Sequence, residues 1–531
     1  MIDKEKIITR LQVISSYYSF GRILGYLKFR EFGSPLEHQK RSLLPDSERL
    51  ISTELAFLAG MWICNVDISK NWPVEDDYLY IEEVCILIGD LHQCYKPTLE
   101  SPFHEQLKEI TFYEGDPGYF WQFLDFAPKK YDNELFRIYL LENHHYDVDF
   151  LRSTFEKIEN QMSKQIHERI AKKQKRHEYF SYINAHTISP KVVQRIFNES
   201  EQNIIRSLSI RLGKKQEKTI TDISDRNIFV QYPIIELPHN KGYFIVEPLT
   251  LSMAMNETPF YWIMDSKLFN KKIVGSIRGT TAENIVYNIA CKKFTGKQIF
   301  KNVLIRKTKS SNTITDIDIL VISKNIYLVF QVKSKRLTEL SRQGDWEAIN
   351  KDFNEAVFNA YNQGCLCVNC LKNAQHYYSL KKKNIETNDK TVFINICVTL
   401  DQYPTISSIS LYKSFEIEKC DIPLLAMSIY DLDLIFELLS DDEILDYFKF
   451  RSDCAQSKIY GITEVYYLGA YIHYCIYGQW HADNSYKIPR EYAIFIDYIV
   501  ETARSRKIQV KSINDIVVLL SKFPPRPMIS E

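Results

Sequence analysis

The segments TDIDILVI (residues 315–322) and IYLVFQVKSK (residues 326–335) decide the fold at the centre of this chain. Both have strand length and are rich in Ile and Val, and a short polar turn separates them, so they predict a β-hairpin. Side chains two positions apart on a strand share a face, so Gln331 and Lys333 point the same way, and hairpin pairing brings them beside Asp318. A carboxylate, an amide oxygen and an ammonium that meet at a strand end are suited to hold Mg²⁺ and a phosphate.

The flanking sequence supplies the other elements of a mixed α/β domain. Residues 280–294 have helical spacing, residues 298–305 read as an apolar strand, and residues 391–398 read as a further buried strand. After the hairpin, apolar side chains recur with helical period from Trp346 to Tyr361, which predicts an amphipathic helix that packs on the sheet.

This arrangement resembles the PD-(D/E)XK nuclease superfamily, in the variant where Gln replaces the (D/E) position of the motif. Asp318 precedes the apolar hairpin, Gln331-x-Lys333 closes it, and Glu283 lies on the helix before the first core strand. Mrr-type restriction endonucleases, NERD-like nucleases and the endonuclease subunit of heteromeric transposases are similar here. The resemblance covers about residues 275–400 and implies an α/β restriction-endonuclease-like core, a mixed sheet flanked by helices, within a mostly helical multidomain chain.

The resemblance also implies a role for each site residue. Glu283 and Asp318 would hold Mg²⁺ or Mn²⁺, helped by the Gln331 amide oxygen and the Val332 carbonyl. Lys333 would orient or activate the attacking water and stabilise the charge that develops on the phosphate. Because Gln331 carries no charge, we expect weaker metal binding than at a site made only of carboxylates.

Two of these assignments have alternatives. Asp316 competes with Asp318 as the metal ligand, although Asp318 lies directly before the apolar run, where the family places its Asp. Thr280-x-x-Glu283 also fits a capping box, in which the Glu side chain only satisfies an amide at a helix start. Against this, Glu283 shares a helical face with the apolar Val286, and a carboxylate on a buried face needs a partner.

The charge balance limits how the chain can bind nucleic acid. Lys+Arg and Asp+Glu both number 67, so the formal net charge is zero and any contact with phosphates must use local basic patches. We expect Lys335, Arg336 and Arg342 to contact nucleic acid beside the site, and the runs 172–176 and 381–383 are further candidates, although ordinary solvated surface is the alternative for each.

Four regions are predicted along the chain. Residues 1–204 read as a helical N-terminal region, 205–270 as a connector that contains a β-hairpin, 271–405 as the nuclease domain, and 406–531 as a mainly helical C-terminal region.

The connector hairpin is expected where the apolar period changes. We place its strands at residues 228–230 and 243–246, on either side of a turn-forming cluster at 238–242.

Cysteine usage and apolar runs indicate the compartment. The eleven cysteines are odd in number and scattered, which does not fit a secreted disulfide framework. The N-terminus has no apolar signal core, and no apolar run has membrane-span length, so we expect a cytoplasmic protein without membrane contact.

Cys365, Cys367 and Cys370 lie close to His376, but no second pair follows at knuckle spacing, so we favour free thiols over a zinc site.

We therefore predict a Mg²⁺-dependent (endo)nuclease that hydrolyses phosphodiester bonds, with DNA favoured over RNA. By analogy, the flanking regions are suited to recruit a partner protein within a prokaryotic defence or transposition complex. The alternative is a catalytically inactive nuclease fold that serves as a scaffold or binds nucleic acid. The presence of Glu283, Asp318, Gln331 and Lys333 together favours the enzyme.

Overall fold

The computed structural model divides the chain into two compact units, Met1–Lys271 and Lys272–Glu531. The connector predicted at 205–270 thus shares a unit with the N-terminal helices, and the C-terminal helices share a unit with the region predicted as nuclease. The structure describes residues 3–32, 50–95, 118–171, 180–214, 219–342, 345–372, 376–379, 385, 387–403, 406–408, 420–483 and 486–525.

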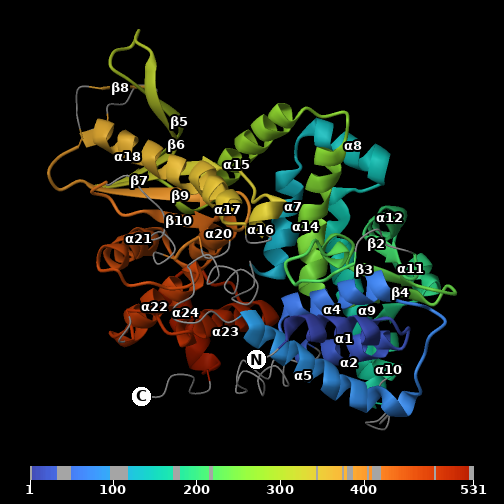
Figure 1. The fold of residues 1–531 in the computed structure, drawn as a ribbon. Coiled ribbons are helices and arrows are strands. Elements are labelled where there is room, and N and C mark those ends of the chain that lie inside the picture. Colours follow the sequence, from blue (N-terminus) through green and yellow to red (C-terminus); the bar gives the residue numbers. More distant parts are fainter. Residues whose placement is uncertain are drawn as a thin grey trace. The chain divides into compact units, whose positions relative to one another are not determined.

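The first unit is built mainly of helices (Figure 1). They are α1 (Lys4–Ser15), α2 (Phe20–Phe32), α4 (Ser52–Asn65), α5 (Asp77–Tyr95), α7 (Phe120–Lys130), α8 (Glu134–His144), α9 (Leu151–Ala171), α10 (Phe180–Ala185), α11 (Pro190–Ile196), α12 (Glu199–Ser207), α13 (Ile228–Gln231) and α14 (Pro248–Asp265). The apolar stretch around Leu55–Trp62 lies on α4 and is buried in a cluster with α1, α2 and α5, so this segment is a core helix.

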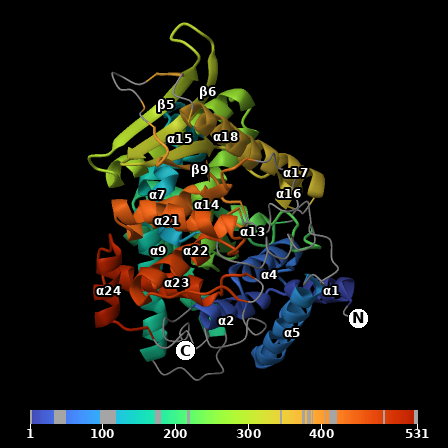
Figure 2. The same cartoon turned by 90° about the vertical axis from the view of Figure 1, so that its left-hand side faces the viewer.

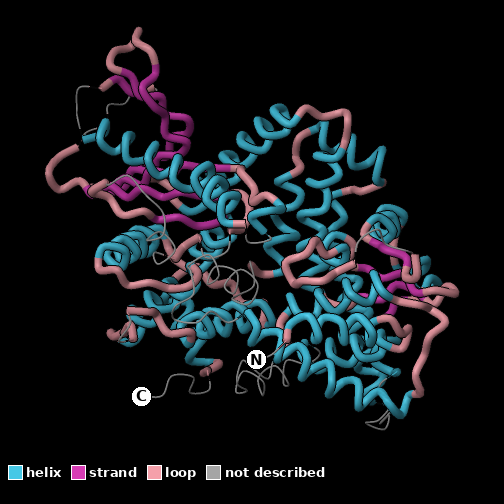
Figure 3. Tube along the Cα trace, in the orientation of Figure 1, coloured by secondary structure: helices cyan, strands magenta, loops and turns pink. Residues whose placement is uncertain are grey.

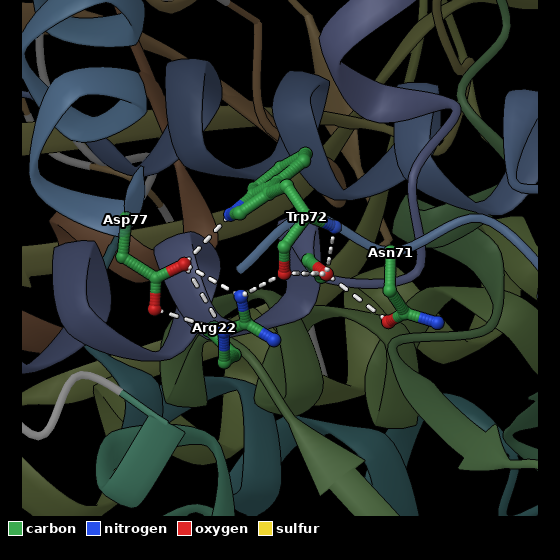
Figure 4. Close-up of polar contacts among 5 residues, drawn as sticks. Arg22, Asn71, Trp72 and Asp77 are labelled. Atoms are coloured by element: carbon green, nitrogen blue, oxygen red, sulfur yellow. Dashed lines mark hydrogen bonds and ion pairs between the residues drawn. The ribbon is translucent and has the colours of Figure 1, made fainter. Parts of the chain in front are cut away.

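A buried ion pair ties α2 to α5 in this unit (Figure 4). The Asp77 carboxylate is fully buried and accepts hydrogen bonds from Arg22, at 2.7 and 2.8 Å, and from the Trp72 indole at 2.7 Å. Arg22 also donates to the Trp72 carbonyl at 3.1 Å. Because both oxygens of the carboxylate accept hydrogen bonds and the partner is a charged guanidinium, the charge is tolerated inside the core.

The predicted connector hairpin belongs to a small sheet of the first unit, but one of its strands lies elsewhere in the sequence. Its strand order is β1–β4–β3–β2, and the hairpin pairs β3 (Ile234–Leu237) with β4 (Gly242–Ile245). The predicted strand at 228–230 is wrong, because these residues form α13. Asn227 caps that helix by accepting a hydrogen bond from the Phe229 amide at 2.9 Å, and three apolar residues alone do not distinguish a strand from a helical turn. The remaining strands are β1 (Thr187–Ile188) and β2 (Ser209–Arg211).

The second unit contains a six-stranded mixed sheet in the order β10–β9–β7–β6–β5–β8. Strands β5, β6 and β7 are antiparallel neighbours, whereas β7, β9 and β10 are parallel. The strands are β5 (Gln298–Arg306), β6 (Thr313–Ser323), β7 (Ile326–Lys333), β8 (Tyr377–Tyr378), β9 (Val392–Thr399) and β10 (Leu425–Ser428). The predicted hairpin and both flanking strands are confirmed. Figure 2 shows β5 and β6 extending beyond the other strands, and Figure 3 shows the strands of the sheet in magenta.

Helices cover both faces of this sheet (Figure 1). On one face, Cys367 and Val368 of α18 (Asn359–Lys372) pack with Val303, Ile317 and Val329 of the sheet. On the other face, the Phe330 ring meets Phe448 of α21 (Asp441–Gln456). The sheet therefore lies between two helical layers, which explains why β7 is apolar on both faces.

The helix after the hairpin is confirmed and contains a π-helical turn. It runs as α17 (Trp346–Phe353), the π-helical segment Asn354–Phe358 and then α18. π-Helical turns shift the helix register and occur frequently at functional sites. The short α16 (Glu339–Arg342) precedes it.

The helix before the first core strand begins earlier than the predicted residue 280. It is α15 (Lys271–Lys293), and its buried residues include Val274 and Arg278. Gly275 and Gly279 lower helix propensity in this segment, but burial of one helix face overrides that preference.

The part of the second unit that follows β10 is helical. Its helices are α20 (Ile429–Leu438), α21, α22 (Glu464–Tyr477), α23 (Glu491–Ser505) and α24 (Ile513–Lys522). Within the described part of the chain, no helix is both long and apolar enough to cross a bilayer.

Candidate active site

The predicted site lies where β6 separates from β7. Their ladder ends at Ile319 and Phe330, while β7 continues beside β9 as far as Lys333. Beyond that point the Asp318 carboxylate takes the place of a backbone acceptor, since it receives a hydrogen bond from the Val332 amide at 2.7 Å. Asp318 is only 7% exposed. The separation of the strands therefore positions a buried carboxylate at the centre of the sheet.

Strand alternation is interrupted at the same place. Ile317 and Leu320 both belong to the apolar cluster with α18, although they are three residues apart and would alternate faces on a regular strand. On the neighbouring strand, Asn302 has a φ of +54°, and the β5–β6 pairing skips Asn302 and Asp318. Irregularities of this kind bend a strand and re-aim its side chains, and they are over-represented beside active sites.

The environment of Asp318 favours its protonated form. Burial raises the pKa of this carboxyl to about 6, even though the Val332 amide and the Lys333 ammonium oppose the shift. The negative charges of Glu283 and Asp316 raise the pKa further. Opposite charge brought into this position would stabilise the carboxylate, so the site is suited to bind a cation.

Gln331 is fully buried and has one unused polar atom. Its Nε2 donates a hydrogen bond to the Asp316 carbonyl at 2.9 Å, and the distance to the Cys367 sulfur is 3.5 Å. Its Oε1 is buried and has no hydrogen-bond partner. A buried acceptor without a donor is costly, so this oxygen is available to a ligand.

Gln363 of α18 connects Lys333 with Asp316. The Lys333 ammonium donates to the Gln363 Oε1 at 3.0 Å, and the Gln363 Nε2 donates to the Asp316 carboxylate at 3.0 Å. Cys367, one turn further along α18, donates to the Asp316 carbonyl at 3.1 Å. Gln363 was not predicted as a site residue. The signal that could have found it is helical spacing, because Gln363 lies four residues before Cys367 on the face of α18 that covers the sheet.

Glu283 lies in the middle of α15, so the capping-box alternative is wrong: no helix starts near Thr280. Its side chain is 25% exposed, and its Oε2 lies 3.7 Å from the ammonium of Lys301 on β5. Lys301 also donates to Asn284 at 2.5 Å. Lys301 was not predicted as a site residue, because its pairing with α15 depends on how the helix crosses the sheet.

The predicted nucleic-acid contacts have different surroundings. The Lys335 ammonium lies 3.1 Å from the Asp352 carboxylate and 2.7 Å from that of Glu355, and Arg336 is buried. Lys335 is therefore neutralised by two acids, and its role at a phosphate stays a prediction. The side chain of Arg342 and the basic runs 172–176 and 381–383 lie outside the described residues.

The cysteine cluster consists of buried thiols on α18. Cys365, Cys367 and Cys370 are free, and burial raises the pKa of Cys367 to about 12. Over the described ranges, no group of three or more His, Cys, Asp or Glu side chains is arranged to hold a metal ion. A cation at the predicted site would therefore need amide, backbone or water oxygens beside the carboxylates.

The residues at the site fit that requirement. Mg²⁺ prefers oxygen ligands and keeps several waters, so it is bound by one or two carboxylates with few other protein groups. Asp318 and Glu283 would supply the carboxylates, and the unpartnered Gln331 Oε1 would supply a neutral oxygen. The Val332 carbonyl remains a predicted ligand.

One comparison with known proteins bears on this region. Residues 278–394 match the family model of the nuclease-related domain, NERD. The match runs from α15 to the start of β9 and so includes every element that forms the site. It supports a nuclease-like superfamily for this segment, and the mixed sheet flanked by helices is consistent with a nuclease-like core. Neither the curated proteins nor the solved structures contain a significant match to the chain.

Proposed function

We propose that the second unit is a divalent-metal-dependent nuclease of the PD-(D/E)XK type. The observation that carries the proposal is the arrangement where β6 leaves β7: a buried Asp318 whose pKa is raised, a second carboxylate from Glu283, and an unpartnered Gln331 oxygen. The family match to a nuclease-related domain supports the reaction class.

In this proposal the site residues divide into ligands and an electrostatic group. Asp318, Glu283 and the Gln331 Oε1 would hold Mg²⁺ or Mn²⁺. When bound, the ion would lower the pKa of a water and offset charge on the scissile phosphate. Lys333, held by Gln363, would donate from its ammonium to the water or to a phosphate oxygen, where negative charge develops in the transition state. Asp316 would act through Gln363, as a positioning residue.

We further propose DNA as the substrate and a partner protein in a defence or transposition complex, by analogy with the families that the motif resembles. Lys335 is already paired with Asp352 and Glu355, so its contact with a substrate phosphate is restricted. Dependence on a partner protein is consistent with this restriction.

A cleavage assay tests the proposal. The purified full chain would be incubated with plasmid DNA, linear duplex, single-stranded DNA and RNA, with Mg²⁺ or Mn²⁺ and with EDTA. We expect cleavage that requires the metal and is lost in Asp318→Asn, while Asp446→Asn retains it, because Asp446 is an exposed carboxylate that pairs with Lys449 on its own helix. Cleavage undiminished by EDTA would refute the metal mechanism. Binding without cleavage under every condition would favour the inactive scaffold.

A further inference from the structure

The ammonium of Lys301 lies beside a carboxylate that the proposed site needs for its cation. Its distance to the Glu283 Oε2 is 3.7 Å, and its second polar partner is the Asn284 side chain on the same helix. The Lys301 side chain is only 21% exposed. The Lys301 ammonium therefore attracts the Glu283 carboxylate in the metal-free protein.

The irregularity of β5 explains why this lysine faces α15. Phe300 and Val303 both contribute to the apolar cluster on the α18 side, although a regular strand would place residues three apart on opposite faces. Asn302, with its φ of +54°, lies between them, opposite Asp318, and the β5–β6 pairing skips both residues. The same irregularity thus places Lys301 on the opposite face, next to Glu283.

We propose that Lys301 exchanges partners when the site is loaded: it pairs with Glu283 in the metal-free protein and binds a phosphate of the nucleic-acid backbone once a divalent cation has taken Glu283. This inference rests on the proposed function and adds a substrate-binding residue to it. The physical reason is charge balance. A cation at Glu283 would remove the attraction that holds the ammonium and would repel it, and a substrate phosphate would supply an anion that can then neutralise Lys301.

The exchange makes two linked predictions for Lys301→Met, which keeps the length of the side chain and removes its charge. Metal binding should tighten by about two- to fivefold, because the competing ion pair is partly exposed and such pairs are worth little. Affinity for duplex DNA should fall in the presence of a divalent cation and stay unchanged in EDTA, because only the loaded site releases the ammonium.

Calorimetry with Mn²⁺ and a 20-base-pair DNA duplex would measure both effects on the full chain, with Ca²⁺ in place of Mg²⁺ during DNA binding. In Ca²⁺, the slope of log affinity against log salt concentration should be shallower for Lys301→Met than for the wild type, by about one phosphate contact. Lys297→Met is the matched control, because Lys297 precedes β5 and pairs with Asp441 and Asp442, at 3.7 and 3.3 Å. It should match the wild type in every measurement.

The outcomes separate this inference from the proposed function. Tighter Mn²⁺ binding together with a DNA defect confined to Ca²⁺ supports the exchange. A DNA defect of equal size in EDTA and Ca²⁺ would make Lys301 an ordinary basic surface residue, and weaker Mn²⁺ binding would make it a support for Glu283; either result overturns the exchange. If the wild type cuts with metal and Lys301→Met has the same Mn²⁺ and DNA affinities as the wild type, only this inference fails. If the wild type neither binds Mn²⁺ nor cuts, the proposed function fails with it.

Discussion

Lys333 and Asp316 are joined through a single side chain, the amide of Gln363, with hydrogen bonds of 3.0 Å on either side. The lysine lies at the end of β7 and the aspartate near the start of β6, where the two strands have already separated. An amide is suited to this position because it accepts from the ammonium with its oxygen and donates to the carboxylate with its nitrogen.

Gln363→Leu should therefore lower kcat about 10- to 100-fold and leave KM within about threefold, because it removes the group that orients a transition-state donor. Gln363→Glu keeps the acceptor for Lys333 but places a carboxylate against Asp316, so it should recover part of kcat. Steady-state kinetics on a DNA substrate would measure both variants. Equal loss in Gln363→Glu and Gln363→Leu, or a change in KM alone, would refute the positioning role.

Asp318→Ala should abolish cleavage, and Lys333→Ala should lower the rate by about 100-fold or more, the scale seen when one transition-state donor is lost. Asp316→Ala should retain part of the activity, since the Asp316 carboxylate supports Lys333 indirectly, through its hydrogen bond from Gln363. Circular dichroism would show whether each variant is folded. A larger loss in Asp316→Ala than in Asp318→Ala would exchange the roles of the two aspartates.

Asp318→Asn should stabilise the metal-free protein at neutral pH while it removes activity. The folded-state pKa of about 6 lies above the ordinary value of 3.8, so ionisation of Asp318 above pH 6 costs stability, and this cost disappears as the pH falls towards 4. Asn can still accept from the Val332 amide. In EDTA, the variant should thus have the higher Tm at pH 8, and the difference should vanish near pH 4. Equal Tm values at pH 8 would contradict the raised pKa.

Gln331→Glu should give a protein whose stability depends on metal. The new carboxylate loses the Nε2 donor to the Asp316 carbonyl and adds charge to a fully buried position, at a cost of about 1–3 kcal/mol or more. Added Mg²⁺ should offset this cost, because the variant offers three carboxylates. The rise in Tm from EDTA to Mg²⁺ should exceed that of the wild type, whereas Gln331→Leu should show a smaller rise. Identical shifts in all three proteins would place the ion elsewhere.

Asp77→Ala should destabilise the first unit by about 3–5 kcal/mol, because it leaves Arg22 charged and partly buried without its partner. Urea unfolding followed by tryptophan fluorescence would report the loss, since Trp72 donates to the same carboxylate. A change of less than about 1 kcal/mol would mean that water replaces the carboxylate at no cost.

The sequence by itself determined the central elements of the second unit. The two apolar runs around residues 323–325 have strand length, are rich in Ile and Val and flank a short polar turn, which favours paired strands. The helical period from Trp346 to Tyr361 requires a surface to pack on. These are local patterns, which is why β6, β7 and the helix that ends in α18 were predicted close to their observed positions. The order of polar residues along these elements also indicated Asp318, Gln331 and Lys333 as neighbours.

Only the tertiary structure decided how those side chains are paired. The start of α15 at Lys271 excluded the capping role of Glu283, because burial of the helix face outweighs the two glycines that weaken the helix there. The contacts of Lys333 with Gln363, of Lys301 with Glu283 and of Lys335 with Asp352 join residues at least 17 positions apart. Such contacts depend on how helices cross a sheet and where its strands diverge, and neither quantity is encoded in local spacing.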